Sequence, residues 1–216
     1  MADFQLLSKE DRGTMVPLNL GFTARKFPVI GTSPDYFTAR NITPKKGTVP
    51  LKLGEAVLGS KCAEKLNIQI NEHILTDQVN LYDLSASYPL KLKIVGILNQ
   101  TKSADDNAIF TSIGTAWVIS GLGHGHEPIN ESTANDKLLG KTEKQITANA
   151  SVEQFIEINE KNINEFHFHS DPTQLPVTSI LAFPKSKKDG TILKAKYLQH
   201  EQIQPLEPDS VIKELL

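Results

Sequence analysis

Phe27-Pro-Val-Ile-Gly-Thr-Ser-Pro-Asp-Tyr-Phe37 joins an apolar run to the start of a helix. The apolar residues before Gly31 predict a strand. Ser33 is a good N-cap and Pro34 fits a first helical position, so we expect a helical turn over residues 34–38. This stretch therefore predicts a strand that leads directly into a short helix.

Two further segments have the same order of elements. Residues 55–58 form a short apolar run, after which Ser60 is the expected N-cap of a helix that ends near Leu66 and holds Cys62 on its apolar face. Residues 108–111 predict a strand, and Ser112 is the expected cap of a helix over 113–120. Between residues 68 and 98, short β-branched runs are separated by gaps of hairpin length. The sequence therefore predicts an α+β fold and not a doubly wound α/β sheet.

Composition narrows the function classes. The chain has 216 residues, of which 39% are hydrophobic and 22% charged, which is typical of a folded, soluble protein. The net charge of −2 and the 6% aromatic content give little basis for nucleic-acid binding. Cys62 is the single cysteine, so an intramolecular disulfide and a thiolate zinc site are both excluded. No signal-peptide pattern is present at Met1.

An acidic segment follows Gly121. Residues 124–171 contain nine acids and four bases, a local charge of −5. Near its end, Ser151 and Gln154 form a capping box, and apolar residues at i, i+3, i+4 spacing predict a helix that reaches Ile163. Beyond this segment, the sequence predicts a strand over 177–183, a mixed segment over 192–199 and a short strand over 202–206.

Four of the six histidines lie in this acidic segment as two His-x-His pairs. They are His124 and His126, followed by Glu127, and His167 and His169, followed two residues later by Asp171. In an extended chain, residues i and i+2 point to the same side, so each pair offers two imidazoles on one face. The two pairs together predict a four-nitrogen metal site with Glu127 or Asp171 as further ligands, for zinc by default and otherwise for copper or nickel. The alternative is two pairs of solvated loop histidines.

No catalytic constellation stands out. Asp105 and Asp106 are the best paired carboxylates, but they lie in a polar loop beside Lys102, which favours a solvated turn. His73 and His200 stand alone and are expected to be structural, and the single tryptophan is expected in the core.

The ordered segments carry a resemblance to a known family. They are residues 27–37, 47–48, 55–66, 93–98, 106–112 and 208–216. In this order they resemble the periplasmic core domain of MacB/FtsX-like ABC transporter permeases, over about residues 16–120 and 176–216. The resemblance implies a two-lobed α+β domain. A discontinuous porter-like lobe would comprise residues 1–53 and 111–216, with the acidic, His-bearing insertion at about 121–171, and a smaller α/β lobe would comprise residues 54–110.

The resemblance also implies a function. Such a domain lies in the periplasm, between two transmembrane helices of a bacterial inner-membrane permease, and is not itself an enzyme. A separate ABC ATPase subunit hydrolyses ATP, and the domain transmits the motion for export or for lipoprotein and envelope processes. A periplasmic adaptor or lipoprotein is the expected partner, and the histidines suggest a response to metal. The alternative hypothesis is a stand-alone periplasmic zinc-binding protein or zinc hydrolase that uses the two His-x-His pairs.

Overall fold

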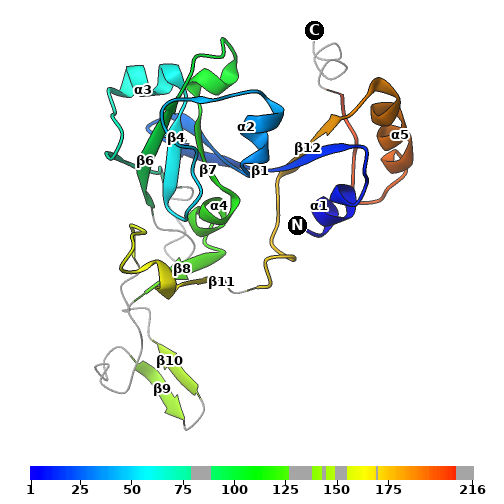
Figure 1. The fold of residues 1–216 in the computed structure, drawn as a ribbon. Helices are drawn as coiled ribbons and strands as arrows, with labels where there is room; N and C mark the ends of the chain where they lie inside the picture. Colours follow the sequence, from blue (N-terminus) through cyan, green and yellow to red (C-terminus); the bar gives the residue numbers. More distant parts are fainter. Residues whose placement is uncertain (79–88, 127–137, 143–144, 149–154, 169, 208–216) are drawn as a thin grey trace.

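An eight-stranded mixed sheet forms the centre of the protein (Figure 1). The structure, a computed structural model, describes residues 1–78, 89–126, 138–142, 145–148, 155–168 and 170–207. In spatial order the strands are β12 (Ser179–Pro184), β1 (Gly13–Ala24), β2 (Phe27–Thr32), β7 (Ile109–Ser112), β4 (Glu55–Leu58), β6 (Lys91–Leu98) and β3 (Pro44–Gly47), and β5 (His73–Leu75) also pairs with β6. The predicted α+β class is confirmed.

Parallel and antiparallel neighbours are mixed across the sheet. The pairs β2–β7 and β4–β6 are parallel, whereas β1–β2, β4–β7 and β3–β6 are antiparallel. Strand β4 begins the predicted smaller lobe and pairs with β7, which crosses the predicted boundary between residues 110 and 111, and β7 pairs in turn with β2 of the porter-like lobe. Strands from both predicted lobes thus lie in one sheet, and the division into lobes stays a prediction.

Apolar side chains cover both faces of the sheet. On one face, α3 (Ser60–Leu66) and α4 (Ile113–Ile119) contribute Cys62 and Ala116 to the larger cluster. On the other face, α2 (Asp35–Ala39) contributes Tyr36 and Phe37, whose rings contact Phe110 of β7 with centroids 5.3 and 5.6 Å away. Alternate strand residues supply the two clusters, as the pleat of a strand requires.

The three predicted strand–helix junctions exist, but only one has the predicted cap. The Ser112 hydroxyl accepts a hydrogen bond from the Thr115 amide at 3.1 Å and caps α4 as predicted. Helix α2 begins one residue later than predicted, and the Ser33 hydroxyl donates to the Asp35 carboxylate at 3.3 Å. Helix α3 begins at Ser60 itself, so the residue in the cap position is Gly59.

The solvated turn predicted at Asp105 and Asp106 is wrong. Both residues lie in the short 3-10 helix η1 (Ala104–Asn107) and are buried. Asp105 accepts hydrogen bonds from the Tyr36 hydroxyl at 2.6 Å and from the Arg40 guanidinium at 2.5 Å. Asp106 accepts a hydrogen bond from the backbone amide of Thr101 at 2.7 Å. Asp105 therefore links η1 to α2, and Asp106 links it to the turn at Thr101, instead of facing water.

The helix predicted to end at Ile163 is also wrong over its described part. Residues 155–158 are not helical, with Ile158 buried and Ile156 51% exposed. The Lys91 amide donates to the Ile156 carbonyl at 2.7 Å, and the Glu157 carboxylate contacts both the Lys91 ammonium at 2.5 Å and His73 Nε2 at 3.2 Å. This segment therefore docks beside β6, and residues 151–154 lie outside the described residues.

The two ends of the described chain pack together. Helix α1 (Ala2–Ser8) and helix α5 (Lys187–Tyr197) lie side by side next to β12 in Figure 1. Leu7, Met15, Leu193 and Tyr197 form a separate buried cluster between them. The mixed segment predicted over 192–199 is mostly the second half of α5, and residues 202–206 form no strand.

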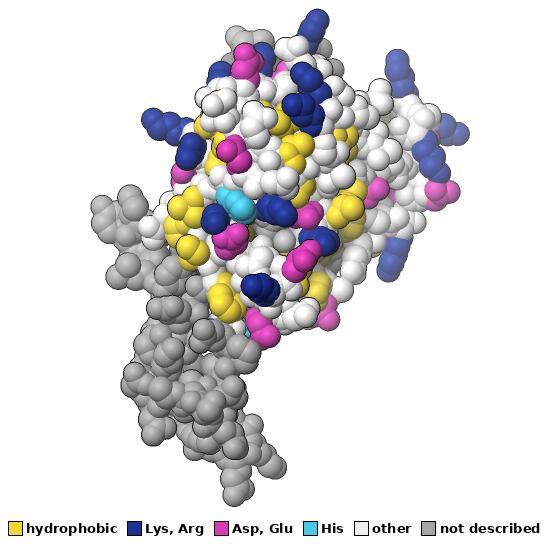
Figure 2. Space-filling view, turned by 60° about the vertical axis from the view of Figure 1, so that its left-hand side comes forward, with side chains coloured by type: hydrophobic (Ala, Val, Ile, Leu, Met, Phe, Trp, Pro, Cys, Tyr) yellow, Lys and Arg dark blue, Asp and Glu magenta, His cyan; other side chains and the backbone are white. Residues whose placement is uncertain are grey.

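The acidic insertion contains a pair of strands of its own, and the surface in view carries mixed charges. Strands β9 (Leu138–Thr142) and β10 (Gln145–Ala148) pair antiparallel within the acidic segment. On the face shown in Figure 2, basic and acidic side chains are interspersed with apolar ones, in agreement with the nearly neutral net charge. Among the described helices, none has the length and hydropathy needed to cross a bilayer.

Candidate metal centre

A short two-stranded ribbon brings the two His-x-His segments together. Strand β8 (Gly123–Gly125) follows α4, and β11 (Phe166–Phe168) follows the 3-10 helix η3 (Ile163–Glu165). The strands pair antiparallel, with His167 directly opposite His124. These two histidines are 43 positions apart in the sequence, near the two ends of the acidic insertion. The ribbon thus places histidines from both pairs side by side.

Alternation along both strands separates two kinds of side chain. In the register, Phe166 lies opposite Gly125 and Phe168 lies opposite Gly123. A Cβ atom on Gly123 or Gly125 would lie 2.6 Å from the ring of Phe168 or Phe166, so each phenylalanine ring covers a glycine. The histidines occupy the intervening positions and therefore project from the other side of the ribbon.

The phenylalanine side of the ribbon rests on the protein core. The Phe168 ring meets the Trp117 ring edge to face, with centroids 5.9 Å apart, and Phe166 packs against the larger core cluster. Trp117 is buried, as predicted, and its indole N–H donates to the Pro176 carbonyl at 2.7 Å. These contacts fix the ribbon, and so they fix the positions from which the histidines project.

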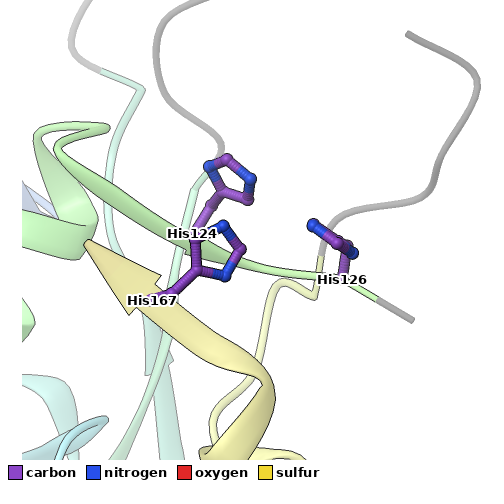
Figure 3. A group of neighbouring side chains, drawn as sticks. All are labelled: His124, His126 and His167. Carbon is purple, nitrogen blue, oxygen red and sulfur yellow. The ribbon is translucent and has the colours of Figure 1, made fainter. Parts of the chain in front are cut away.

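The histidine side of the ribbon carries three imidazoles in one group (Figure 3). One ring nitrogen from each of His124, His126 and His167 lies within 4.8 Å of the other two. The ring centroids are 4.7 Å apart for His124 and His167, and 5.2 Å apart for His126 and His167. His124 and His126 are half-buried and His167 is exposed, so an ion from solvent can reach the group.

The backbone orients one of these rings. Nδ1 of His167 lies 3.2 Å from the carbonyl oxygen of Glu165. When Nδ1 carries the proton and donates to this carbonyl, Nε2 keeps its lone pair and is the nitrogen that can bind a metal. A backbone carbonyl in this position is a common way to orient a metal-binding histidine.

Three of the six predicted ligands therefore meet. Asp171 does not join them: its Oδ1 accepts hydrogen bonds from the Thr173 amide at 2.8 Å and the Thr173 hydroxyl at 2.6 Å, which hold the pKa of the carboxyl below its usual value. Glu127 and His169 lie outside the described residues, so their part in the site stays a prediction.

His73 and Cys62 are chemically reactive side chains, but their contacts indicate structural roles. His73 forms the contact with Glu157 described above. Cys62 is fully buried on α3, and burial raises the pKa of its thiol to about 12, so formation of the nucleophilic thiolate is suppressed.

Comparison with known proteins identifies the family. The model of the MacB-like periplasmic core domain matches residues 9–158, which include β8 and end before β11. The chain belongs to this family. The resemblance stated from the sequence is thereby confirmed for a MacB-like domain. His124 and His126 lie inside the matched region, and His167 lies beyond its end.

Two solved structures are similar to this MacB-like domain. The periplasmic region of MacB from Actinobacillus actinomycetemcomitans is 12% identical with a TM-score of 0.40, and the match covers 52% of this chain and 54% of that chain. The extracellular domain of the noncanonic ABC-type transporter YknZ from Gram-positive bacteria is 14% identical with a TM-score of 0.41, and the match covers 53% of this chain and 63% of that chain. The matches thus span less than two thirds of either solved domain. Comparison with curated proteins gave no match.

Proposed function

We propose that this MacB-like domain is the periplasmic part of an ABC transporter permease and that it transmits ATP-driven motion across the envelope. In this role, a separate ABC ATPase subunit hydrolyses ATP, and the membrane helices of the permease carry the motion to the domain. The motion drives export, or it drives a lipoprotein or envelope process through a periplasmic partner. The family match favours this role over a free-standing zinc hydrolase.

The observation that carries the proposal is the pairing of β1 with β12. Residues 13–18 pair with residues 179–184, so segments near both ends of the chain share one set of main-chain hydrogen bonds. Strand β1 continues into the central sheet through its pairing with β2. A displacement applied to either end is therefore delivered to the same packed element.

Side chains reinforce this junction. Lys196 of α5 forms an ion pair with Glu10, and the Tyr197 hydroxyl donates to the same carboxylate at 3.0 Å. Together with the buried cluster of α1, β1 and α5, these contacts join the two ends into one unit.

The test measures movement of the domain in the complete permease, assembled with its ATPase in lipid nanodiscs. A fluorescent dye is attached to Leu51→Cys, because Leu51 is 68% exposed and the native Cys62 is buried. Energy transfer from this dye to labelled lipids reports its height above the membrane. We expect the transfer to change between the ADP state and the state trapped with ADP and vanadate after ATP hydrolysis.

A second dye position tests whether the domain moves as a unit. Leu198, which is 65% exposed and follows α5, is labelled in the same way as Leu198→Cys. Both positions are expected to change together, and an ATPase subunit inactivated in its own active site should abolish both changes. ATP hydrolysis at the normal rate with no change at either position would reject the proposed transmission.

A further inference from the structure

We propose that His124, His126 and His167 bind one divalent transition-metal ion, with zinc as the preferred ion, and that this ion fastens β8 to β11. The inference is independent of the transport role, since it concerns only the ribbon and its ligands. The ion would link the two ends of the acidic insertion, because 40 residues, 127–166, separate His126 from His167.

The geometry of the group suits a metal after small side-chain rotations. Nitrogen ligands about 2.1 Å from a tetrahedral ion lie about 3.4 Å from each other. The three nitrogens already lie within 4.8 Å of one another. Rotation about the side-chain bonds of the three histidines can close this difference without moving the strands, because the backbone positions are fixed from the opposite side of the ribbon.

The identity of the ligands selects the class of ion. Neutral imidazoles suit zinc, copper and nickel, whereas magnesium and calcium prefer carboxylate and carbonyl oxygens. Three histidines leave a fourth position of a tetrahedral ion for water or for one further ligand. The surrounding segment has a net charge of −5, which attracts a cation to this part of the protein.

The position of the ligands determines what the ion does. His124 and His126 follow α4, which is packed in the core, while His167 belongs to the returning strand. An ion bound to all three adds a cross-strand link to the few hydrogen bonds of a three-residue pairing. The bound ion thereby stabilises the closed ribbon against its separation, as any ligand specific to one state does.

The test uses the full 216-residue chain without a histidine tag, and ZnCl₂ as the probe. Isothermal titration calorimetry is expected to give one zinc per chain, and a hundredfold excess over Kd is expected to raise Tm by about 5–10 °C. Single variants His124→Ala, His126→Ala and His167→Ala are each expected to lower zinc affinity more than about tenfold, since even the loss of an outer partner of a ligand costs that much. His200→Ala is the matched control and is expected to bind zinc normally.

Two further measurements locate the ion. Hydrogen exchange is expected to show slower exchange for the amides of residues 123–126 and 166–168 when zinc is added. Cobalt(II) is expected to give the visible absorption of a tetrahedral site, and His167→Gln, which keeps a polar side chain of similar length, should remove it. Zinc binding that persists unchanged in all three alanine variants, or no binding by the wild-type chain, would overturn the proposal.

Discussion

Asp105 and Asp106 are adjacent, and each carboxylate is held by a different set of donors. Burial disfavours the charged form of Asp105, but hydrogen bonds from Tyr36, Arg40 and Ser103 outweigh it and hold its pKa below the usual value. The same balance, with backbone and side-chain donors of Thr101, lowers the pKa of Asp106. Both carboxylates therefore stabilise the folded state in their charged form.

The variant Asp105→Asn should lower the stability of the fold and weaken its dependence on pH. The charged form stabilises the fold above the unfolded-state pKa of about 3.9, and this contribution is lost as pH falls toward the lower pKa of the folded state. We expect the variant to lose about 1–3 kcal/mol at pH 7. Its free energy of unfolding should also fall less steeply than that of the wild type as pH falls from about 5 to about 3. Urea unfolding followed by Trp117 fluorescence measures both.

Glu64→Gln is the control for the loss of one carboxylate charge in Asp105→Asn. Glu64 is exposed on α3, so the variant removes one carboxylate without opening a buried network. If Asp105→Asn and Glu64→Gln had the same stability at pH 7 and the same slope with pH, the assignment of Asp105 as a stabilising buried charge would be wrong.

For single residues, the sequence predicts burial from local apolar spacing, but it does not reveal hydrogen-bond partners that are distant in the chain. The polar loop around Asp105 gives no sign of Arg40 and Tyr36, because these partners are 65 and 69 positions away in the chain. The core positions predicted for Cys62 and Trp117 are confirmed, because each residue lies among apolar neighbours with helical spacing.

At the scale of elements, the ribbon of β8 and β11 depends on its glycines. Phe166 covers Gly125 so closely that any added Cβ atom must displace the ring. We therefore expect Gly125→Ala to cost about 1–3 kcal/mol of stability by overpacking and to weaken zinc binding by tilting β8. Thermal unfolding and zinc titration of the variant measure the two effects.

Gly190→Ala is the corresponding control in a helix. The nearest heavy atom to an added Cβ there is Cγ of Pro184, at 3.2 Å, and alanine favours the helical backbone. This variant should bind zinc like the wild type. An unaltered Tm and zinc affinity for Gly125→Ala would instead contradict the assignment of the phenylalanine and histidine sides of the ribbon.

The local spacing of apolar residues predicts part of helix α5, but it predicts the wrong structure around Phe155. The apolar residues around Phe155 fit helical spacing, but the chain there is not helical. It is hydrogen-bonded to β6 and β8, partners that local spacing in the sequence does not show. The prediction also finds only the second half of helix α5. A signal for its start is present in the sequence: the Ser186 hydroxyl accepts a hydrogen bond from the Asp189 amide at 3.2 Å, an arrangement related to the capping box.

At the scale of the whole molecule, β12 closes one side of the sheet. It covers the edge of β1 over residues 13–18. A chain ending after Pro176 would lack both β12 and α5 and would expose this edge, which is then free to pair with another chain. We expect this shortened chain to form oligomers and to unfold at a lower temperature. Light scattering after size exclusion and thermal unfolding measure these changes.

A chain ending after Leu206 keeps β12 and α5 and serves as the control. It should behave like the full chain. A monomeric Pro176-ended chain with the Tm of the full chain would show that β12 is not required to protect β1. Local sequence pattern could reveal neither the pairing of β1 with β12 nor the order of the sheet, because even the nearest paired residues, Leu18 and Ser179, are 161 positions apart.

The two sides of the β8–β11 ribbon also have an evolutionary consequence. Glycine and phenylalanine on one side are constrained by the core, whereas the histidines on the other side are not needed to fill it. Substitution at the three histidine positions can therefore remove the proposed metal site while the scaffold persists. We then expect relatives with the same fold to differ in their capacity to bind metal.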